Sequence, residues 1–352
     1  MTETQTTVEV AEARVPGRER AINIIGLTLV GLVVLWMIKE LIQSPSQFIT
    51  LFLDGVNNGS LYALVALGYT LVYGIIELIN FSHGDLFMLA TVFAGMVLVT
   101  GFGAREASVA TFGLMAFVLV LTMMAAAALN MTAERVAYRR LRRAPKLAPL
   151  ITAVGLSFIY QWLGLQTWGP WGTGSTPKQW DTLIGNRAFT VGDVTIHWST
   201  VVVVGVTIPL LILLQRIVQQ TRQGKAMRAT AQDQDAARLM GIDVDRTIAF
   251  TFGLGGAMAG AAGMLWVESV GTTRYDLGFQ LGLIAFTAAV LGGIGNLNGA
   301  VLGGFLIGII QALNDGLGFG QKWSQTVVFT ILIALMVFRP EGILGKPTTE
   351  KV

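Results

Sequence analysis

The chain has 352 residues, 53% of them apolar, and its 24 basic and 21 acidic side chains leave a net charge of +3. Charged residues make up 13% of the chain, against about 25% in soluble proteins, so a soluble fold would expose large apolar patches. The small net charge and the lack of a basic stripe argue against a nucleic-acid partner. The chain has no cysteine for disulfides or metal thiolates.

Ten apolar runs follow one another along the chain. A helix that crosses a bilayer needs about 20 mostly apolar residues, and the eighth and ninth runs are shorter than that. The sequence therefore predicts an all-α, polytopic transmembrane helix bundle of about eight to ten membrane segments, with short or broken helices near the C-terminal third. The runs cover residues 22–43, 51–75, 80–100, 112–130, 150–168, 199–217, 248–268, 280–293, 299–314 and 323–339.

These runs divide the chain into a disordered N-terminal tail at 1–21, a transmembrane domain at 22–340 and a C-terminal tail at 341–352. Two loops, 134–146 and 215–247, hold six basic residues each, and ten crossings place both loops on the same side as the two tails. That side then carries 18 of the 24 basic residues, so the positive-inside rule predicts that both termini are cytoplasmic. Most tryptophans lie near the opposite face, as an interfacial belt would.

The loop at 169–198 lies on the outer side in this arrangement. Its Gly and Pro residues predict turns, and the alternation in Phe189–Ile196 predicts a short hairpin. Such a loop either caps the outer mouth, receives a partner, or simply connects two spans.

A polar stretch interrupts apolar sequence at Asn80, Ser82, His83 and Asp85. Ser-x-x-Asp ahead of an apolar run resembles a capping box, and a helix N-terminus in a transporter suits a bound carboxylate. Polar side chains at this depth are expected to face a cavity or the cytoplasmic boundary. The alternative is a helix–helix turn with purely structural capping.

Two asparagines, Asn57 and Asn58, lie near the predicted outer end of the second run. They either contact a polar substrate or cap the helix there, and the known preference for Asn at caps favours capping.

The loop at 215–247 contains Asp235, Ala236, Ala237 and Arg238, followed by Gly241. Asp235 and Arg238 are three residues apart and can pair along a helix face, and Gly241 suits the left-handed residue that ends a helix. A short capped surface helix is predicted, with Ala236, Ala237 and Met240 as a small apolar patch. From these residues alone, a plain solvated loop helix is the favoured interpretation.

Glycines at four-residue spacing fill the C-terminal third of the chain. Small residues at this spacing let helices approach closely, and the same contacts would let helices slide between inward-open and outward-open states. The helix-packing candidates are Gly292, Gly293, Gly295, Gly299 and Gly303.

Four segments together resemble the LIV-type permeases of branched-chain amino acid ABC importers. Asn57–Gly74 looks like the opening membrane segment of that family, and Ile79–Asp85 is similar to its "INFAHGE"-like motif, with Ser82 for Ala and Asp85 for Glu. Ala288–Gly304 resembles its glycine-rich signature, and Arg339–Gly345 its ending. The segment from Asp235 resembles the Glu-Ala-Ala…Gly coupling loop of ABC importer permeases, with Asp in place of Glu.

This resemblance implies a non-catalytic permease subunit in a bacterial inner membrane that carries branched-chain or other hydrophobic amino acids, with urea or short amides left open. It implies a second related permease subunit as a heterodimer, two ATPase subunits that hold the ATP and Mg, and an extracytoplasmic solute-binding protein. It also implies an ATPase-coupling role for Asp235–Gly241. The candidates for the substrate path are Asn57, Asn58, Ser60, Tyr62, Asn80, Ser82, His83 and Asp85.

The sequence contains no Gly-x-x-x-x-Gly-Lys-Ser/Thr loop, so ATP hydrolysis is expected in a partner subunit. This chain itself is expected to hold no cofactor. A stand-alone ion-coupled transporter is the alternative class, and such proteins usually keep ionisable groups at the membrane midplane. The acidic residues of the apolar runs lie near predicted span ends instead, which favours the permease subunit.

Overall fold

The computed structural model divides the chain into two units, Met1–Phe48 and Ile49–Val352. In the first unit residues 35–43 are helical, and most of the predicted span at 22–43, with the tail at 1–21, lies outside the described residues. The second unit, from Ile49 on, holds the elements discussed below, except for the first residues of the helix that begins at Pro45. The structure describes residues 35–77, 80–98, 109–142, 144–145, 147–168, 171–180, 182–184, 187–339 and 341–345.

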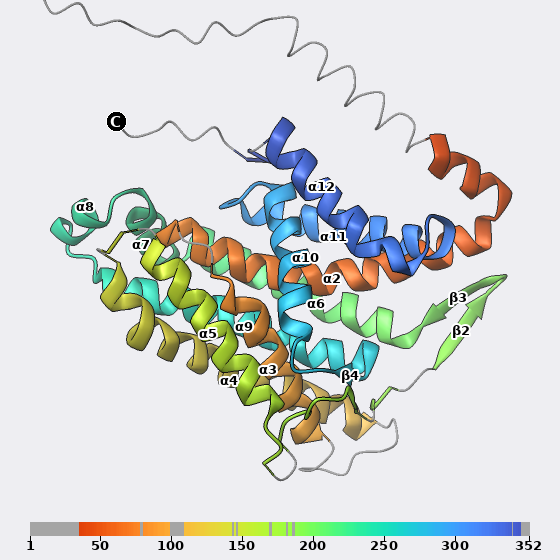
Figure 1. Ribbon diagram of the computed structural model, residues 1–352, viewed down its shortest axis with the longest axis horizontal. Helices are drawn as coiled ribbons and strands as arrows, with labels where there is room; N and C mark the ends of the chain where they lie inside the picture. Colours follow the sequence, from red (N-terminus) through yellow and green to blue (C-terminus); the bar gives the residue numbers. More distant parts are fainter. Residues whose placement is uncertain are drawn as a thin grey trace, which may run out of the picture. The chain divides into compact units, whose positions relative to one another are not determined.

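The described chain is almost entirely helical, and seven of its helices are long and apolar enough to cross a membrane (Figure 1). This confirms the predicted all-α polytopic fold. The long helices are α2 (Pro45–Ile76), α4 (Val109–Ala133), α5 (Leu147–Leu165), α6 (Trp198–Gln220), α9 (Val244–Val270), α11 (Leu297–Leu317) and α12 (Ser324–Phe338), the last of which reaches 18 residues together with the turn at Gln321–Trp323. The shorter ones are α3 (Ser82–Met96), α7 (Arg222–Gln232), α8 (Gln234–Leu239) and α10 (Leu277–Gly292), with short turns η2 (Glu134–Tyr138), η3 (Arg139–Leu141) and η4 (Gln321–Trp323).

Two antiparallel strand pairs lie at the end of the bundle opposite α7 and α8. β2 (Ala188–Val191) and β3 (Val194–His197) form the predicted hairpin, with the positive-φ glycine Gly192 in its turn. β1 (Lys178–Gln179) pairs with β4 (Thr272–Thr273), which ties the loop to the end of α9.

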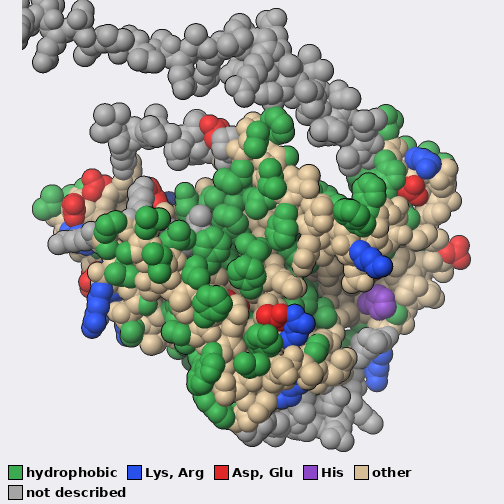
Figure 2. All heavy atoms as spheres, viewed as in Figure 1, with side chains coloured by type: hydrophobic (Ala, Val, Ile, Leu, Met, Phe, Trp, Pro, Cys, Tyr) green, Lys and Arg blue, Asp and Glu red, His purple; other side chains and the backbone are tan. Residues whose placement is uncertain are grey.

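The centre of the bundle is formed by α2, α3 and α9. In α2 and in α9, 83% of the apolar membrane-spanning stretch is buried inside the protein, whereas in α4 and in α6 the buried share is 22%. Glycines bring α9 against α4, since a Cβ on Gly256 would lie 2.6 Å from the carbonyl oxygen of Ala126. Apolar side chains dominate the face shown in Figure 2, and charged groups are sparse on it, as expected of helices that face lipid.

The two short apolar helices, α3 and α10, begin at the same place in the bundle. With 15 and 16 residues, each spans about 22–24 Å, less than the ~30 Å hydrocarbon core. A Cβ on Gly84 would lie 2.2 Å from the carbonyl oxygen of Gly278, so the first turns of the two helices touch through glycine backbone.

From this junction the helices run toward opposite ends of the bundle. The last turn of α3 packs Gly95 against Trp180, beside the strand pairs, and the end of α10 meets the start of α11, where Asn296 and Asn298 line a cavity with Arg228 of α7. The junction therefore lies inside the bundle, between its two ends. The expectation that the ninth run, 299–314, is short was wrong: α11 has 21 residues, and α3 is the second short helix.

The predicted packing glycines divide into two kinds. Gly292 and Gly299 face each other so closely that a Cβ on Gly292 would lie 1.9 Å from the Gly299 carbonyl oxygen, and Gly303 meets Ala288 at the same distance. Gly293 has a φ of 106° and packs on the backbone of Gly345. Gly295 differs: a Cβ on it would meet nothing within 4 Å, its φ of 88° shapes the α10–α11 turn, and its Cα lies 3.8 Å from where a Cβ on Gly74 of α2 would be.

Candidate functional site

A polar cluster holds the turn that precedes α3. The Oδ1 atom of Asn80 accepts hydrogen bonds from the hydroxyl groups of Ser82 at 2.6 Å and Tyr138 at 2.7 Å. All three side chains are buried, so the turn is fastened to the end of α4 by neutral hydrogen bonds. The predicted capping box was wrong, because Phe81 is the N-cap residue and α3 has no side-chain cap hydrogen bond.

His83 is a packing residue of the α2–α3 contact. Its ring is fully buried and meets the ring of Tyr69 edge-on at 5.0 Å. A Cβ on Gly68 would lie 2.0 Å from its Nε2 atom, so the imidazole fills the space that this glycine leaves. Gly68 lies eight residues before the end of α2, which again places the start of α3 well inside the bundle.

Asp85 lies at the α3–α10 junction with no exposed surface. It accepts hydrogen bonds from Ser157 and from Nε2 of Gln161 at 3.3 Å, both on α5. Within the described part of the chain no basic side chain forms an ion pair with it. A buried carboxylate with only neutral donors is costly in an apolar interior, so this group is the strongest functional candidate in the bundle.

A cavity of about 550 Å³ lies beside this carboxylate, between α5 and α10. Ser157 and Gln161 belong to both the cavity wall and the hydrogen-bonded shell of Asp85. The rest of the wall is mostly apolar, with two further polar groups from the start of α10. The full lining is Phe81, Val154, Ser157, Phe158, Gln161, Asp276, Phe279, Gln280 and Leu283.

The candidates on α2 lie apart from this cavity and serve helix contacts. Asn57 donates to Ser269 of α9 at 2.7 Å, and it also donates to its neighbour Asn58 at 3.4 Å. Tyr62 donates to Gln311 of α11 at 2.7 Å. The prediction that Asn57 and Asn58 cap a helix was wrong, because α2 begins at Pro45 and both residues lie within it.

Ser60 turns inward on its own helix. Its hydroxyl is buried and donates to the carbonyl oxygen of Val56, one turn earlier, at 2.8 Å. The eight predicted path residues are therefore not one site. The structure brings Asp85 to a cavity, uses Asn57, Tyr62, Asn80, Ser82 and His83 in contacts between segments, and leaves Ser60 and Asn58 bonded within α2.

The segment from α7 to the start of α9 contains the short capped surface helix that the sequence predicts, which is α8. Asp233 caps α8 by accepting hydrogen bonds from the backbone of Asp235 at 2.8 Å and Ala236 at 3.0 Å. Arg238 pairs with Asp235 at 2.7 Å, three residues earlier. Gly241 has a φ of 83°, the left-handed conformation that closes the helix.

The apolar side chains that α8 exposes differ from the predicted patch. Leu239 and Met240 are 88% and 82% exposed, while Ala237 is buried against the bundle. The patch of Ala236, Ala237 and Met240 was therefore wrong, because Ala237 faces inward. Two large apolar side chains at the tip of a short rigid helix are suited to insertion into a partner's groove.

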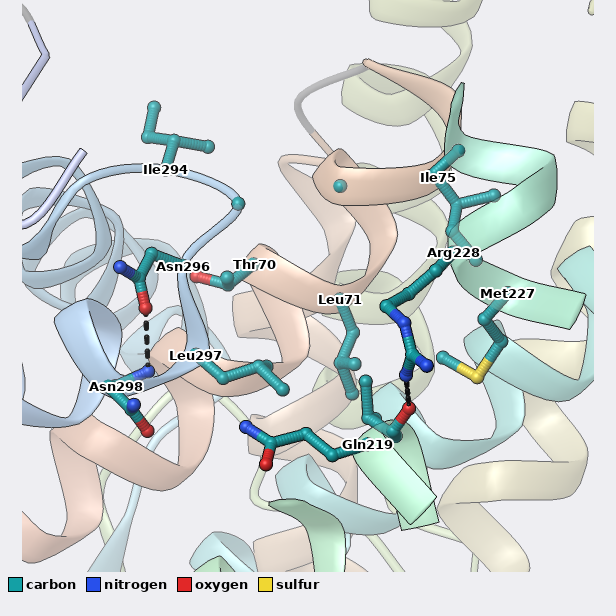
Figure 3. Close-up of a pocket in the computed structure, with 14 residues that line it drawn as sticks. Thr70, Leu71, Ile75, Gln219, Met227, Arg228, Ile294, Asn296, Leu297 and Asn298 are labelled. Atoms are coloured by element: carbon teal, nitrogen blue, oxygen red, sulfur yellow. Dashed lines mark hydrogen bonds between the residues drawn. The ribbon is translucent and has the colours of Figure 1, made fainter. Parts of the chain in front are cut away.

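Arg228 anchors α7 to the end of α6 by donating a hydrogen bond to the Val218 carbonyl group (Figure 3). A second cavity of about 560 Å³ lies between this corner, the end of α2 and the α10–α11 turn. Asn296 closes its far side and caps α11 by accepting from the backbone of Asn298 at 3.0 Å. The segment around α7 and the glycine-rich turn thus share one cavity.

An ion network that the sequence analysis did not single out joins α4 to α9. Arg142 contacts the fully buried Glu134 and also pairs with Asp245 at 2.6 Å. Arg139 lies 3.6 Å from the same Glu134. The available signal was a single acidic residue, Glu134, at the border between an apolar run and six basic residues.

Glu268 performs a similar anchoring role at the opposite end. Its buried carboxylate accepts hydrogen bonds from the backbone of Leu183 at 3.1 Å and Ile184 at 3.4 Å. Lys178 lies 4.3 Å above the ring of Trp180 in the same loop, where burial lowers the pKa of its ammonium group. This loop is therefore folded onto the bundle end.

These features define a multi-pass membrane protein whose polar groups gather at a junction of broken helices and at two helix-end networks. The sequence matches the family described as "Branched-chain amino acid transport system / permease component" over residues 51–336. The chain belongs to this family of permease components. It is therefore one part of a transport system, and its function is transport and not catalysis.

Named relatives agree with this assignment. The permease BraD of Pseudomonas aeruginosa, from a high-affinity branched-chain amino acid transport system, is 37% identical over 312 residues, 87% of this chain and 98% of BraD. LivH of Escherichia coli K12, from a system of the same description, is 37% identical over 314 residues with the same coverage. The autoinducer 2 import permease LsrC of Yersinia pestis is 26% identical over 320 residues, 89% of this chain and 84% of LsrC.

Proposed function

We propose that this chain is the membrane-spanning permease subunit of an ABC importer for branched-chain or other hydrophobic amino acids. The observation that carries the proposal is the near full-length similarity, at 37% identity, to two permeases whose names give this substrate class. The more distant similarity to an autoinducer 2 permease, at 26% identity, favours that substrate less.

The proposed partners are a second related permease subunit, two ATPase subunits and an extracytoplasmic solute-binding protein. The exposed Leu239 and Met240 on α8 are the proposed contact with an ATPase subunit. Since α7 and α8 belong to one of the two loops rich in basic residues, this end of the bundle and both termini are proposed to be cytoplasmic. The opposite end of the bundle, with the strand pairs and the loop that Glu268 holds, is then the outer end.

The proposed coupling route runs from α8 into the bundle. Arg228 ties α7 to the end of α6, and the cavity beside it is shared with the α10–α11 turn. In this route a movement of α7 narrows or widens the cavity beside the α10–α11 turn, and α10 leads from that turn to its junction with α3.

The test is leucine uptake and leucine-stimulated ATP hydrolysis by the co-expressed importer in proteoliposomes. Gly241→Pro is the informative variant, because the proline ring fixes φ near −65° and the native φ is 83°. We expect it to reduce coupled ATP hydrolysis and uptake by at least about tenfold, the effect of losing a contact worth ~1.4 kcal/mol, while the chain still inserts in the membrane.

Gly192→Pro is the matched control, since Gly192 also has a positive φ, 63°, and open space around it, but lies in the β2–β3 turn. Full coupling in Gly241→Pro would overturn the proposed role of α8. Leucine uptake down an ion gradient by this chain alone, without ATPase subunits, would overturn the importer assignment.

A further inference from the structure

The α3–α10 junction carries a net negative charge that nothing in the described chain neutralises. Asp85 is fully buried and receives only the neutral donors Ser157 and Gln161. The nearest acidic neighbour, Asp276, is paired with Arg274, so this arginine's charge is already balanced. A buried charge left in this state favours a cation that arrives from outside the chain.

The cavity beside Asp85 gives such a cation a route to it. Ser157 and Gln161 line the cavity and donate hydrogen bonds to the carboxylate, so a ligand ammonium group that took the place of these two donors would reach Asp85. The volume, about 550 Å³, lies within the range of sites for small molecules. The cavity is therefore large enough for a single amino acid, and the carboxylate of Asp85 lies directly behind Ser157 and Gln161 of its wall.

The remaining wall is matched to an apolar side chain. Three aromatic residues, Phe81, Phe158 and Phe279, and two aliphatic ones, Val154 and Leu283, line it. Phe279 and Phe158 are 50% and 65% exposed in the free chain, so a ligand placed there would cover apolar surface that is now open.

The start of α10 offers the complementary group for a carboxylate. The N-cap residue Asp276 makes no side-chain cap hydrogen bond, because its carboxylate pairs with Arg274. Asp276 and the first-turn residues Phe279 and Gln280 line the cavity, so the N-terminal turn of this 16-residue helix lies at the wall, where a helix N-terminus favours a negative charge. Gln280, in the same turn, adds an amide to that wall.

We propose that the cavity between α5 and α10 binds a zwitterionic hydrophobic amino acid in transit, with its ammonium group at Asp85 and its side chain against Phe81, Phe158 and Phe279. This inference rests on the proposed function, and it adds a substrate-contacting residue and an orientation. Asp85 selects the charged amino group, and the aromatic wall selects the apolar side chain.

The test uses photo-leucine, a diazirine analogue of leucine, on the fully assembled importer in lipid nanodiscs, with the labelled peptides mapped by mass spectrometry. We expect label on α5 and α10 residues that line the cavity. In Asp85→Asn this label should fall at least about tenfold, because a hydrogen bond between charged groups is lost. A deaminated diazirine acid of the same carbon skeleton should not label the cavity.

Glu268→Gln is the matched control, since Glu268 is also a buried carboxylate that accepts two hydrogen bonds, but it lies away from the cavity. It should keep wild-type labelling. Phe279→Trp is a second variant for the case that Asp85→Asn does not fold: it enlarges a half-exposed side chain at the wall, narrows the cavity and should reduce the label.

Each outcome separates this inference from the proposed function. Leucine uptake by the wild-type importer combined with label elsewhere, or with undiminished label in both Asp85→Asn and Phe279→Trp, would overturn the binding site alone. Absence of ATP-driven leucine uptake would overturn the proposed function, and label in the cavity would then still support the site.

Discussion

Arg142 and Asp245 are 2.6 Å apart, and through this contact the loop after α4 is fixed to the first turn of α9. Arg142 also reaches Glu134, so one guanidinium group serves two acidic residues on different helices. Asp245 lies five residues after Met240, the exposed tip of the proposed coupling segment. The network therefore fixes the position of the segment's downstream end.

We expect Arg142→Ala to destabilise the protein strongly. The substitution leaves the fully buried Glu134 with only Arg139, at 3.6 Å, as a counter-charge. Breaking a buried ion pair in this way costs about 3–5 kcal/mol. Thermal unfolding in detergent should report it as a clearly lowered midpoint.

Arg140→Ala is the control for that experiment, because Arg140 lies in the same loop and is exposed. Its midpoint should stay close to that of the wild type. Equal midpoints for Arg142→Ala and Arg140→Ala would mean that the network does not stabilise the fold.

Gly308→Val should separate α11 from α2. A Cβ on Gly308 would lie 2.3 Å from the backbone nitrogen of Gly59, and that atom cannot move without moving the helix. Overpacking of this kind typically costs about 1–3 kcal/mol, and more where backbone is in the way. We expect poor recovery of monodisperse protein on size-exclusion chromatography.

Gly205→Val makes the same chemical change on α6, where nothing lies within 4 Å of the added carbon. This variant should purify as the wild type does. Similar losses for both variants would point to valine itself, and not to the α2–α11 contact, as the cause.

Glu268→Ala should release the loop at 182–184 from the end of α9. The carboxylate accepts two backbone hydrogen bonds there, at 3.1 Å and 3.4 Å, and hydrogen bonds to charged groups contribute about 1.5–3 kcal/mol. Amide hydrogen exchange at Leu183 should accelerate by at least about tenfold, since 1.4 kcal/mol corresponds to that factor. Unchanged exchange at Leu183 would show that other contacts hold the loop.

Asp233→Ala should fray α8. The side chain of Asp233 accepts from two backbone N–H groups of the first turn, and loss of such a cap costs about 1 kcal/mol. Exchange at the Ala237 amide should rise severalfold. Asp235→Ala is the comparison: it removes only the exposed pair with Arg238, worth a few tenths of a kcal/mol, and should change exchange little.

The sequence predicted the fold class because apolar runs of membrane-spanning length are a local property. The hairpin after Phe189 and the left-handed Gly241 are also set by neighbouring residues, and both appear where the sequence placed them. The short α3 was missed, because the run at 80–100 is long enough to span. The contacts of Gly84 with Gly278 and of His83 with Gly68, which no local pattern contains, show that the helix starts deep inside the bundle.

The candidate site required pairings that no local pattern contains. Asp85 was singled out from its own polar stretch, but its partners Ser157 and Gln161 come from α5, some 70 residues later. They were missed because a serine and a glutamine inside an apolar helix carry no signal by themselves. Asn57 and Tyr62 show the converse, since polar side chains that look available in sequence are used up in contacts with α9 and α11.

The head-to-head start of α3 and α10 has a consequence for how far a solute must be moved. Each helix covers only part of the bilayer, about 22–24 Å, and they extend in opposite directions from one point. A solute at that point is separated from each aqueous phase by a thin layer of protein and not by the whole membrane. Opening either layer is then a local event, and the solute itself hardly needs to travel while the two sides exchange access.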